Sequence, residues 1–373
     1  MHSLRATVDD RPALVTGQMF YQDQKCSLLV QDVRVGSTSA TNLYRSVTAE
    51  FENAQAVAAY RFEDGAMRRT ADTLTLPELD GAPEVGMRYD GVSVCLCSAV
   101  PLPLESFEIH LKAFQDLLTF ASGISCARLS LLALDEEGEE VEILGRVQIH
   151  PKARQVPDVR NFVVRLGSTT TQNMLDIWWK MRRDLRPVTQ VYVGAIYQPG
   201  YVESDFLAAA AAVERMGANL GTPGRAALTE AQLHPIRAAL EGLTDLDADQ
   251  QKVVDLVIKN RKRSPSFRER TAALAAELPS AIVTLAGINV DIWIVQLIAA
   301  RNDVAHEGAS DDEANDFVND RELRAMRDAS RIMIALLLAQ RLGVTDKALQ
   351  LAARQLRARY LQYHRSSLVF SPT

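Results

Sequence analysis

Cysteine is scarce in this chain, with four residues in 373. Cys26, Cys95, Cys97 and Cys126 all lie in apolar, strand-like segments, and Cys95 and Cys97 would point to the same face of one strand. No cysteine or histidine pair lies near them in the sequence to complete a zinc site. We therefore expect reduced, buried thiols, which are typical of a cytoplasmic protein, and no structural metal ion.

Long apolar runs are lacking as well. No segment approaches the roughly 18 apolar residues of a membrane span, and the N-terminus lacks the apolar core of a signal peptide. There are no internal repeats and no low-complexity tails. The 47% hydrophobic and 24% charged fractions are typical of a globular protein, and 373 residues suffice for two or three domains. These features predict a cytoplasmic protein with no membrane partner.

Excess positive charge is also absent, because the formal net charge is −6 at pH 7. An acidic protein does not coat nucleic acid with its whole surface, so any contact with RNA requires a local basic patch. The densest basic cluster lies around Ser264-Pro265 and is either a solvated helix junction or a rim that follows RNA phosphates. Its candidate RNA-binding residues are Lys259, Arg261, Lys262, Arg263 and Arg268.

The first 166 residues are predicted to be rich in β-structure. Runs that are β-branched or alternate between apolar and polar residues are separated by Asp, Gly, Ser and Pro. One helix interrupts them at 104–121, where Phe107, Leu111 and Phe114 recur at helical spacing before Gly123, a suitable helix stop. The predicted strands are 13–21, 26–35, 47–62, 73–79, 92–100, 124–134, 141–149 and 161–166.

From Thr171 the hydrophobic period changes from 2 to about 3.6, which predicts helices. Trp178 and Trp179 mark a bridging helix that should end by Pro187, and we interpret both as interdomain core rather than as a base-stacking platform. A short strand is expected at 190–197. The remaining helices are predicted at 204–220, 228–240, 248–261, 266–278, 290–306, 321–342 and 346–363.

The chain is therefore predicted to be an α+β protein. A β-rich N-terminal domain with one packed helix occupies 1–166, a bridging helix and linker occupy 167–203, and an all-α helical bundle occupies 204–373. This order suggests a sensor or regulatory module fused to an effector module, although fold class alone does not fix function.

The segment Arg-Asn-Asp-Val-Ala-His at 301–306 combines a fixed cation, an amide and a histidine near the end of an apolar helix. RNA is cleaved without a metal when the 2′-hydroxyl attacks the phosphorus, while an acid and a base move protons and a cation offsets the developing charge. Histidine titrates near neutral pH, and the arginine fork stays charged and can hold two phosphoryl oxygens. We predict His306 as the acid or base, Arg301 as the cation and Asn302 as a positioning residue.

Helix geometry constrains this site. Five residues of ideal helix rotate about 500°, which leaves Arg301 and His306 roughly 140° and about 7.5 Å apart on the helix. They can act together if the helix frays at His306, which Gly308 permits, and a second motif across a dimer axis would supply the remaining groups, so we expect a composite site. In the structural alternative the same residues cap the helix end and pair with acids such as Asp303 or Glu307.

Two neighbouring features compete with this interpretation. A second Arg-x4-His pair, Arg359 and His364, lies in the last predicted helix, and we interpret it as terminal-helix surface or as a contact for RNA or a dimer partner. The acidic loop from Glu307 to Asp320 offers an alternative in which Mg²⁺ activates water, although part of it matches a capping box. We expect neither a metal ion nor another cofactor.

Four features follow one another in the second half: an apolar pair with a later Glu, a basic stretch that leads into Leu, an apolar helix that runs into Arg-Asn-x-x-x-His, and a leucine-rich closing helix. They are carried by Phe206-Leu207 and Val213-Glu214-Arg215, by Ser266 to Arg270 with Leu274, by Trp293 to His306, and by Leu336-Leu337-Leu338 to Gly343. In this order they resemble the HEPN superfamily, and specifically its ApeA-like branch from bacterial phage defence. The resemblance covers about residues 104–350.

The resemblance implies a metal-independent endoribonuclease that works as a homodimer through its HEPN domain, with the active cleft where two signature helices meet. It also implies a role in abortive infection, in which the N-terminal domain senses a phage component and the nuclease cleaves host RNA, with tRNA as one candidate. Some HEPN domains have lost catalysis. A non-catalytic module that binds RNA or a nucleotide, and a protein-interaction scaffold, therefore stay open as alternatives.

Overall fold

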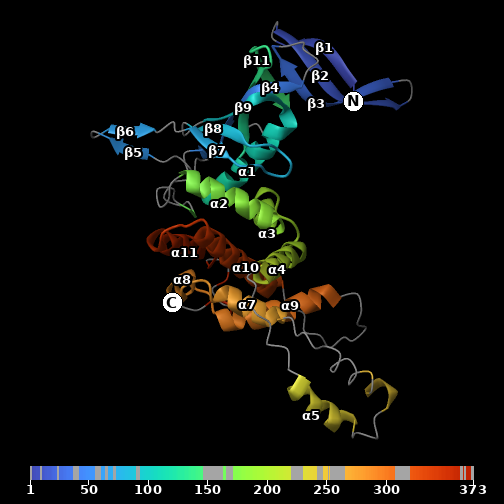
Figure 1. Ribbon diagram of the computed structural model, residues 1–373, viewed down its shortest axis with the longest axis vertical. Coiled ribbons are helices and arrows are strands. Elements are labelled where there is room, and N and C mark those ends of the chain that lie inside the picture. Colours follow the sequence, from blue (N-terminus) through green and yellow to red (C-terminus); the bar gives the residue numbers. More distant parts are fainter. Residues whose placement is uncertain are drawn as a thin grey trace.

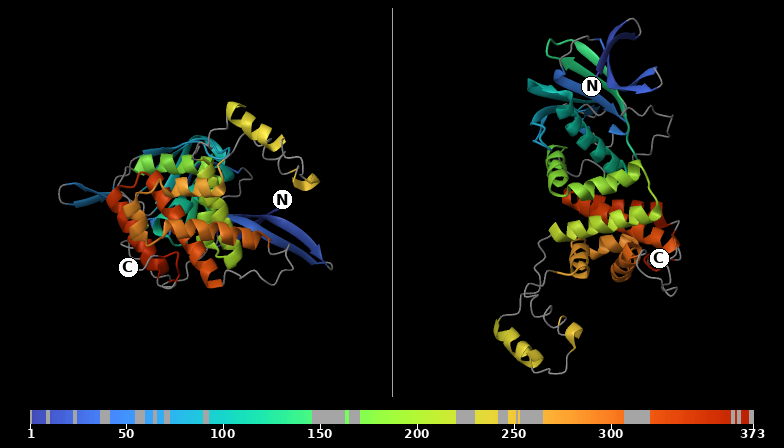
Figure 2. Two further views of the ribbon diagram at one scale, coloured as in Figure 1. Left: turned by 90° about the horizontal axis from the view of Figure 1, so that it is seen from below. Right: turned by 90° about the vertical axis from the view of Figure 1, so that its right-hand side faces the viewer.

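The structure, a computed structural model, describes residues 2–8, 11–22, 25–36, 42–54, 60–63, 66–69, 73–89, 93–145, 163–164, 171–219, 230–241, 247–250, 252, 265–306, 320–361, 364 and 367–370. Strands dominate these residues up to 145, and helices dominate from 171 onwards. The sheet lies at one end of the molecule, and helices follow in layers towards the other (Figures 1 and 2). The expected α+β fold is confirmed.

A nine-stranded antiparallel sheet forms the N-terminal half. Its strands lie in the order β1-β2-β3-β11-β10-β4-β9-β8-β7, and a separate hairpin pairs β5 with β6. Consecutive strands pair at β1-β2-β3, β7-β8-β9 and β10-β11, whereas β3 pairs with β11, and β4 lies between β9 and β10. The strands are β1 (His2–Val8), β2 (Arg11–Gln22), β3 (Lys25–Val35), β4 (Leu43–Phe51), β5 (Tyr60–Glu63), β6 (Ala66–Arg69), β7 (Thr73–Leu76), β8 (Val85–Tyr89), β9 (Ser93–Pro103), β10 (Arg128–Asp135) and β11 (Glu140–Gly145).

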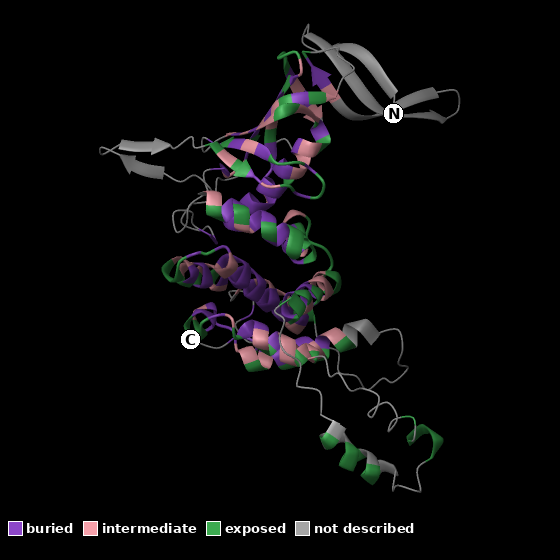
Figure 3. Ribbon diagram, viewed as in Figure 1, coloured by how far each residue is buried: buried purple, intermediate pink, exposed green. Residues whose placement is uncertain are grey.

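Helix α1 (Leu104–Ser122) connects β9 to β10 and packs against the sheet. Its Phe114 ring lies 5.8 Å from Phe51 of β4 and 5.5 Å from Tyr89 of β8, measured between centroids. The helix is buried over most of its surface, as expected for a helix between two layers (Figure 3). It ends at Gly123, whose φ of 67° is the left-handed conformation of the predicted helix stop.

The strand predicted at 47–62 is wrong as a single element. Strand β4 ends at Phe51, and Asn53 then adopts a positive φ of 57°. This left-handed conformation turns the chain out of the strand direction, and asparagine tolerates it better than most residues do. The strand predicted at 161–166 is described only at Val163 and Val164, which are buried but belong to no strand.

Helix α2 (Thr171–Asp184) lies beneath α1 and carries the two tryptophans predicted to be core residues. Both are buried, and each indole nitrogen donates a hydrogen bond to α1: Trp178 to the carbonyl oxygen of Ala113 (2.9 Å) and Trp179 to Nδ1 of His110 (3.1 Å). Trp178 also stacks on the ring of Phe120. The prediction of core tryptophans is confirmed, since they join the sheet layer to the helices that follow.

Replacing Trp178 by alanine should therefore destabilise the fold. The change removes a fully buried indole and leaves a cavity between α1 and α2, so we expect the free energy of unfolding to fall by about 3–5 kcal/mol. Urea denaturation followed by circular dichroism measures this loss. The exposed residue of the same helix, Lys180, supplies the control, and Lys180→Ala should leave the midpoint nearly unchanged. Equal midpoints for the two variants would contradict the assigned role of Trp178.

The strand predicted at 190–197 is wrong, because these residues belong to helix α3 (Arg186–Tyr197). The β-branched residues favour a strand by local propensity, and Pro187 is compatible with either the end or the start of a helix. Proline is well suited to the first turn of a helix, where it stands here. The buried residues Val188 and Tyr192 are four apart, Tyr192 contacts Phe120 of α1, and α3 also packs on α4, so packing on a 3.6-residue period decides the structure.

The remaining helices form a bundle around α10, which is buried along most of its length (Figure 3). Helices α4, α9 and α11 contact it, and α7 packs on α4 and α9. Helix α8 is not predicted by the sequence, and the helix predicted at 248–261 is described only at 248–250 and 252, which are helical. The helices are α4 (Val202–Asn219), α5 (Glu230–Glu241), α7 (Phe267–Ala275), α8 (Ser280–Ala286), α9 (Val290–His306), α10 (Asp320–Arg341) and α11 (Asp346–Leu361).

Two further expectations concern buried, reduced cysteines and the lack of a membrane-spanning helix. Cys126 is buried, whereas Cys95 and Cys97 are only half-buried, because the neighbouring Val94 and Leu96 point into the core instead; all three thiols are free. Cys26 lies in β3, and its side chain is outside the described part of the structure. None of the helices in the described part of the chain has both the length and the apolar character that a membrane span needs.

Candidate functional site

Helix α9 carries the predicted motif and is fixed to the bundle by its apolar face. Trp293, Leu297 and Ala300 recur every three or four residues and are buried. The indole nitrogen of Trp293 donates a hydrogen bond to Oγ of Ser330 in α10 (3.1 Å). At its start, the Asn289 side chain accepts a hydrogen bond from the backbone N–H of Ile292 (3.2 Å). Arg301 follows directly after this buried face.

The helix remains continuous to His306, so fraying at that residue is not observed. Arg301 is partly exposed and Asn302 is exposed. The side chains from Asp303 to His306 lie outside the described part of the structure. On a continuous helix the positions of Arg301 and His306 stand roughly 140° apart. The two helix positions therefore lie on different sides of α9.

Arg301 belongs to an ion-pair network that three helices supply. Its Nη2 donates to Oε2 of Glu214 in α4 (2.9 Å), and Nη2 of Arg270 in α7 donates to Oε1 of the same carboxylate (3.0 Å). The Arg301 guanidinium also lies over the ring of Phe267, 5.1 Å from its centroid, in a cation–π contact. Arg270 is held in turn by the carbonyl oxygen of Pro265 (2.8 Å).

This network has a net positive charge, because one carboxylate is shared by two guanidiniums. The side chains of Arg301 and Glu214 are 38% and 32% exposed, so the cation is fixed in direction but still reaches solvent. The neighbouring acids proposed from the sequence are not its described partner; the partner is Glu214, which is 87 residues away. In the sequence, the only sign that Glu214 has a role is its place in the family resemblance, as the Glu near the end of the first helix of that pattern. Arg301 is thus preorganised to meet an anion.

The comparison with protein families identifies this region. Residues 207–348, from α4 to α11, match the model of the family described as Apea-like HEPN. The helical half contains an Apea-like HEPN domain. Glu214, Arg270 and the Arg301–His306 motif all lie within the matched residues. No curated protein and no solved structure matches the chain.

The basic patch beside the HEPN motif is described in part. Arg268 lies in the first turn of α7 and is exposed, while Lys259, Arg261, Lys262 and Arg263 lie outside the described residues. Helix α7 itself begins with a capping box between Ser266 and Glu269. Most of the acidic loop of the Mg²⁺ alternative is likewise undescribed, and the described residues contain no cluster of three potential metal ligands.

For the second Arg-x4-His pair, the interpretation as terminal-helix surface is wrong at His364. Helix α11 ends at Leu361, and His364 lies beyond it with 4% exposure. Nε2 of His364 is 2.8 Å from Oδ2 of Asp328, and the imidazole stacks on Phe370 with the two rings 5° from parallel. His364 is therefore a buried residue beyond the end of α11 and not part of its exposed surface.

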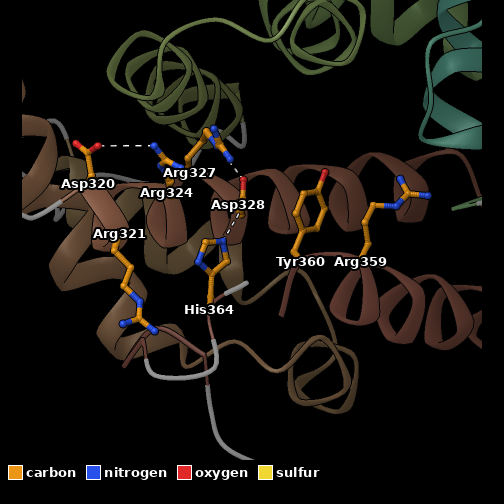
Figure 4. Close-up of a pocket in the computed structure, with 8 residues that line it drawn as sticks. All are labelled: Asp320, Arg321, Arg324, Arg327, Asp328, Arg359, Tyr360 and His364. Atoms are coloured by element: carbon orange, nitrogen blue, oxygen red, sulfur yellow. Dashed lines mark hydrogen bonds and ion pairs between the residues drawn. The ribbon is translucent and has the colours of Figure 1, made fainter. Parts of the chain in front are cut away.

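Arg359 and His364 line one cleft of about 590 Å³ between the start of α10 and the end of α11 (Figure 4). Burial alone would raise the pKa of Asp328, but hydrogen bonds from His364 and Arg327 hold it below its usual value. Nη1 of Arg359 donates to the carbonyl oxygen of Gly123 at the end of α1 (2.9 Å). The second pair therefore lines a pocket and also contacts the N-terminal half.

Proposed function

We propose that this chain is a metal-independent endoribonuclease whose active site is the Arg301–His306 motif of its HEPN domain. The observation that carries the proposal is the solvent-accessible guanidinium of Arg301, which Glu214 holds in place and Phe267 faces, on the helix that also carries His306. A fixed arginine cation is suited to binding a phosphate group, and a histidine five residues later on the same helix is suited to proton transfer.

In the proposed reaction the RNA supplies its own nucleophile. A histidine removes the proton of the 2′-hydroxyl, whose oxygen attacks the adjacent phosphorus and displaces the 5′-oxygen of the next nucleotide. A second proton donor protonates this leaving oxygen, and Arg301 stabilises the charge that develops on the phosphoryl oxygens. Asn302, which is exposed beside Arg301, donates to a phosphoryl oxygen or orients the histidine. Two histidines are available if two copies of the chain combine.

The exposed side of α9 supports such a pairing. Asp291, Val295, Ala299 and Asn302 are exposed and recur every three or four residues, so they form one stripe along the helix. Val295 is 51% exposed, although it is apolar. With 100° per residue, the helix position of His306 falls in the same stripe and Arg301 beside it. Two chains that pack through this stripe would bring their His306 positions together.

A charge in this stripe should separate the dimer. In an isologous interface Val295→Glu introduces two carboxylates near the symmetry axis, where they repel each other and lose hydration. We expect light scattering to show a dimer for the native chain and a monomer for Val295→Glu, with RNA cleavage lost in parallel. Val100→Glu is the matched control, because Val100 is 61% exposed on β9 in the sheet. Full cleavage by a species that scatters as a monomer would reject the composite site.

The proposed biological setting is defence against phage in the bacterial cytoplasm. The N-terminal sheet domain would sense a phage component, and the HEPN domain would then cleave host RNA, with tRNA as a candidate. The experiment that tests the proposed function is RNA cleavage by the purified full-length chain, compared with its His306→Ala variant. RNA binding without cleavage in the native chain would favour a non-catalytic HEPN module instead.

A further inference from the structure

The cleft between α10 and α11 has a strongly positive lining (Figure 4). Four arginines, Arg321, Arg324, Arg327 and Arg359, line it together with two aspartates. Of the two aspartates, Asp328 already accepts hydrogen bonds from within the cleft. The whole chain is acidic, with a net charge of −6, so the cleft is a local concentration of positive charge. Such a lining attracts an anion.

Arg324 and Arg327 have donor capacity for a ligand. Nη2 of Arg324 lies 3.7 Å from Oδ2 of Asp320, and the two side chains are 53% and 75% exposed, so this pair contributes little and is easily exchanged for another anion. Arg327 uses Nε for Asp328, so its terminal nitrogens Nη1 and Nη2 have no hydrogen bond to this carboxylate. Each guanidinium has five N–H donors in a planar fork that matches phosphate oxygens.

His364 gives the cleft a buried polar group that points to a ligand. The side chain is 4% exposed, and Nδ1 has no hydrogen-bond partner among the residues that the structure describes. An unpaired buried nitrogen is costly, and here Asp328 on Nε2 and the stacked Phe370 hold the ring in place. Nδ1 can accept from the hydroxyl of a phosphate monoester, or donate to a phosphoryl oxygen when the ring is protonated.

We infer that this cleft binds a small phosphate monoester of about mononucleotide size. The arginines recognise the phosphate, and His364 makes the single directed hydrogen bond. The volume of about 590 Å³ lies within the range of small-molecule sites, roughly 300–1,000 Å³. All of the lining residues come from α10, from α11 and from the segment after it, and none from the helices that form the Arg301 network. The site is therefore separate from the proposed nuclease centre.

Calorimetric titration of the full-length chain with AMP, inorganic phosphate and adenosine tests the inference. AMP should bind saturably with one site per chain, and adenosine should not bind. Arg324→Gln should weaken AMP about tenfold or more, because it removes a charged donor at an exposed position. The matched control is Arg354→Gln, an exposed arginine of α11 that does not line the cleft, and it should bind AMP as the native chain does.

A second variant tests the histidine directly. His364→Gln keeps an N–H donor for Asp328 but removes the second ring nitrogen, so its affinity for AMP should be lower. AMP should raise the melting temperature of the native chain and should not raise that of His364→Gln. Equal binding of inorganic phosphate and AMP supports the site and shows that the phosphate alone is recognised. Binding of adenosine, absence of saturable binding, or an equal loss in Arg354→Gln overturns the inference. RNA cleavage, measured separately, has no bearing on these outcomes.

Discussion

His306→Ala should reduce RNA cleavage by the purified chain about 10²–10⁴-fold, the range expected when a general acid or base is lost. Arg301→Ala should cost about 10²–10³-fold, because the phosphoryl oxygens lose their cation in the transition state. Both positions lie at the end of α9, beyond the buried residues that anchor this helix, so the fold should stay intact. Rates are measured on one RNA substrate under single-turnover conditions, with melting temperatures for each variant.

The controls follow from the burial of the other histidines. His234 is exposed on α5, and His234→Ala should cleave RNA at the native rate. His364→Ala is unsuitable as a neutral control, because His364 is buried and holds Asp328, so its loss should lower stability. One outcome would show that the wrong Arg-x4-His pair has been assigned to catalysis. In that outcome His306→Ala cleaves RNA at the native rate, whereas a folded variant of the other pair, such as His364→Gln, does not cleave RNA.

Replacing the 2′-hydroxyl at the cut site with hydrogen should abolish cleavage at that site. The proposed mechanism uses this hydroxyl as its nucleophile, so DNA should be inert and RNA should be cut at an undiminished rate in EDTA. The products should be a 2′,3′-cyclic phosphate and a 5′-hydroxyl. Electrophoresis of an RNA with a single 2′-deoxy substitution, with end groups determined by mass spectrometry, measures all of these outcomes.

The opposing mechanism makes different products. If acidic residues between Glu307 and Asp320 hold Mg²⁺ and activate water, cleavage should stop in EDTA, persist without the 2′-hydroxyl and leave a monophosphate with an intact 2′-hydroxyl. Those products would reject 2′-hydroxyl attack here, while the assignment of residues 207–348 to the Apea-like HEPN family would be unaffected.

Elements with a strong local pattern could be predicted from the sequence. Helix α9 is observed at Val290–His306, the range that was predicted, because its apolar positions recur at helical spacing. Helix α1 and its stop at Gly123 were likewise predicted to within one residue. The family resemblance was also readable, since its features depend on the order of residues along the chain, and the match confirms it for residues 207–348. Local propensity failed at α3, where packing against α1 and α4 outweighed a β-branched composition.

The sequence by itself thus determined the α+β class, most helices, the HEPN assignment and the candidate motif. Only the tertiary structure decided which side chains meet: that Glu214 holds Arg301, and that Asp328 and Arg359 share one cleft with His364. The reason is physical. Helical and strand periods are set by neighbours within a few residues, whereas an ion pair or a buried histidine depends on how elements far apart in the chain pack, and many packings are compatible with the same local pattern.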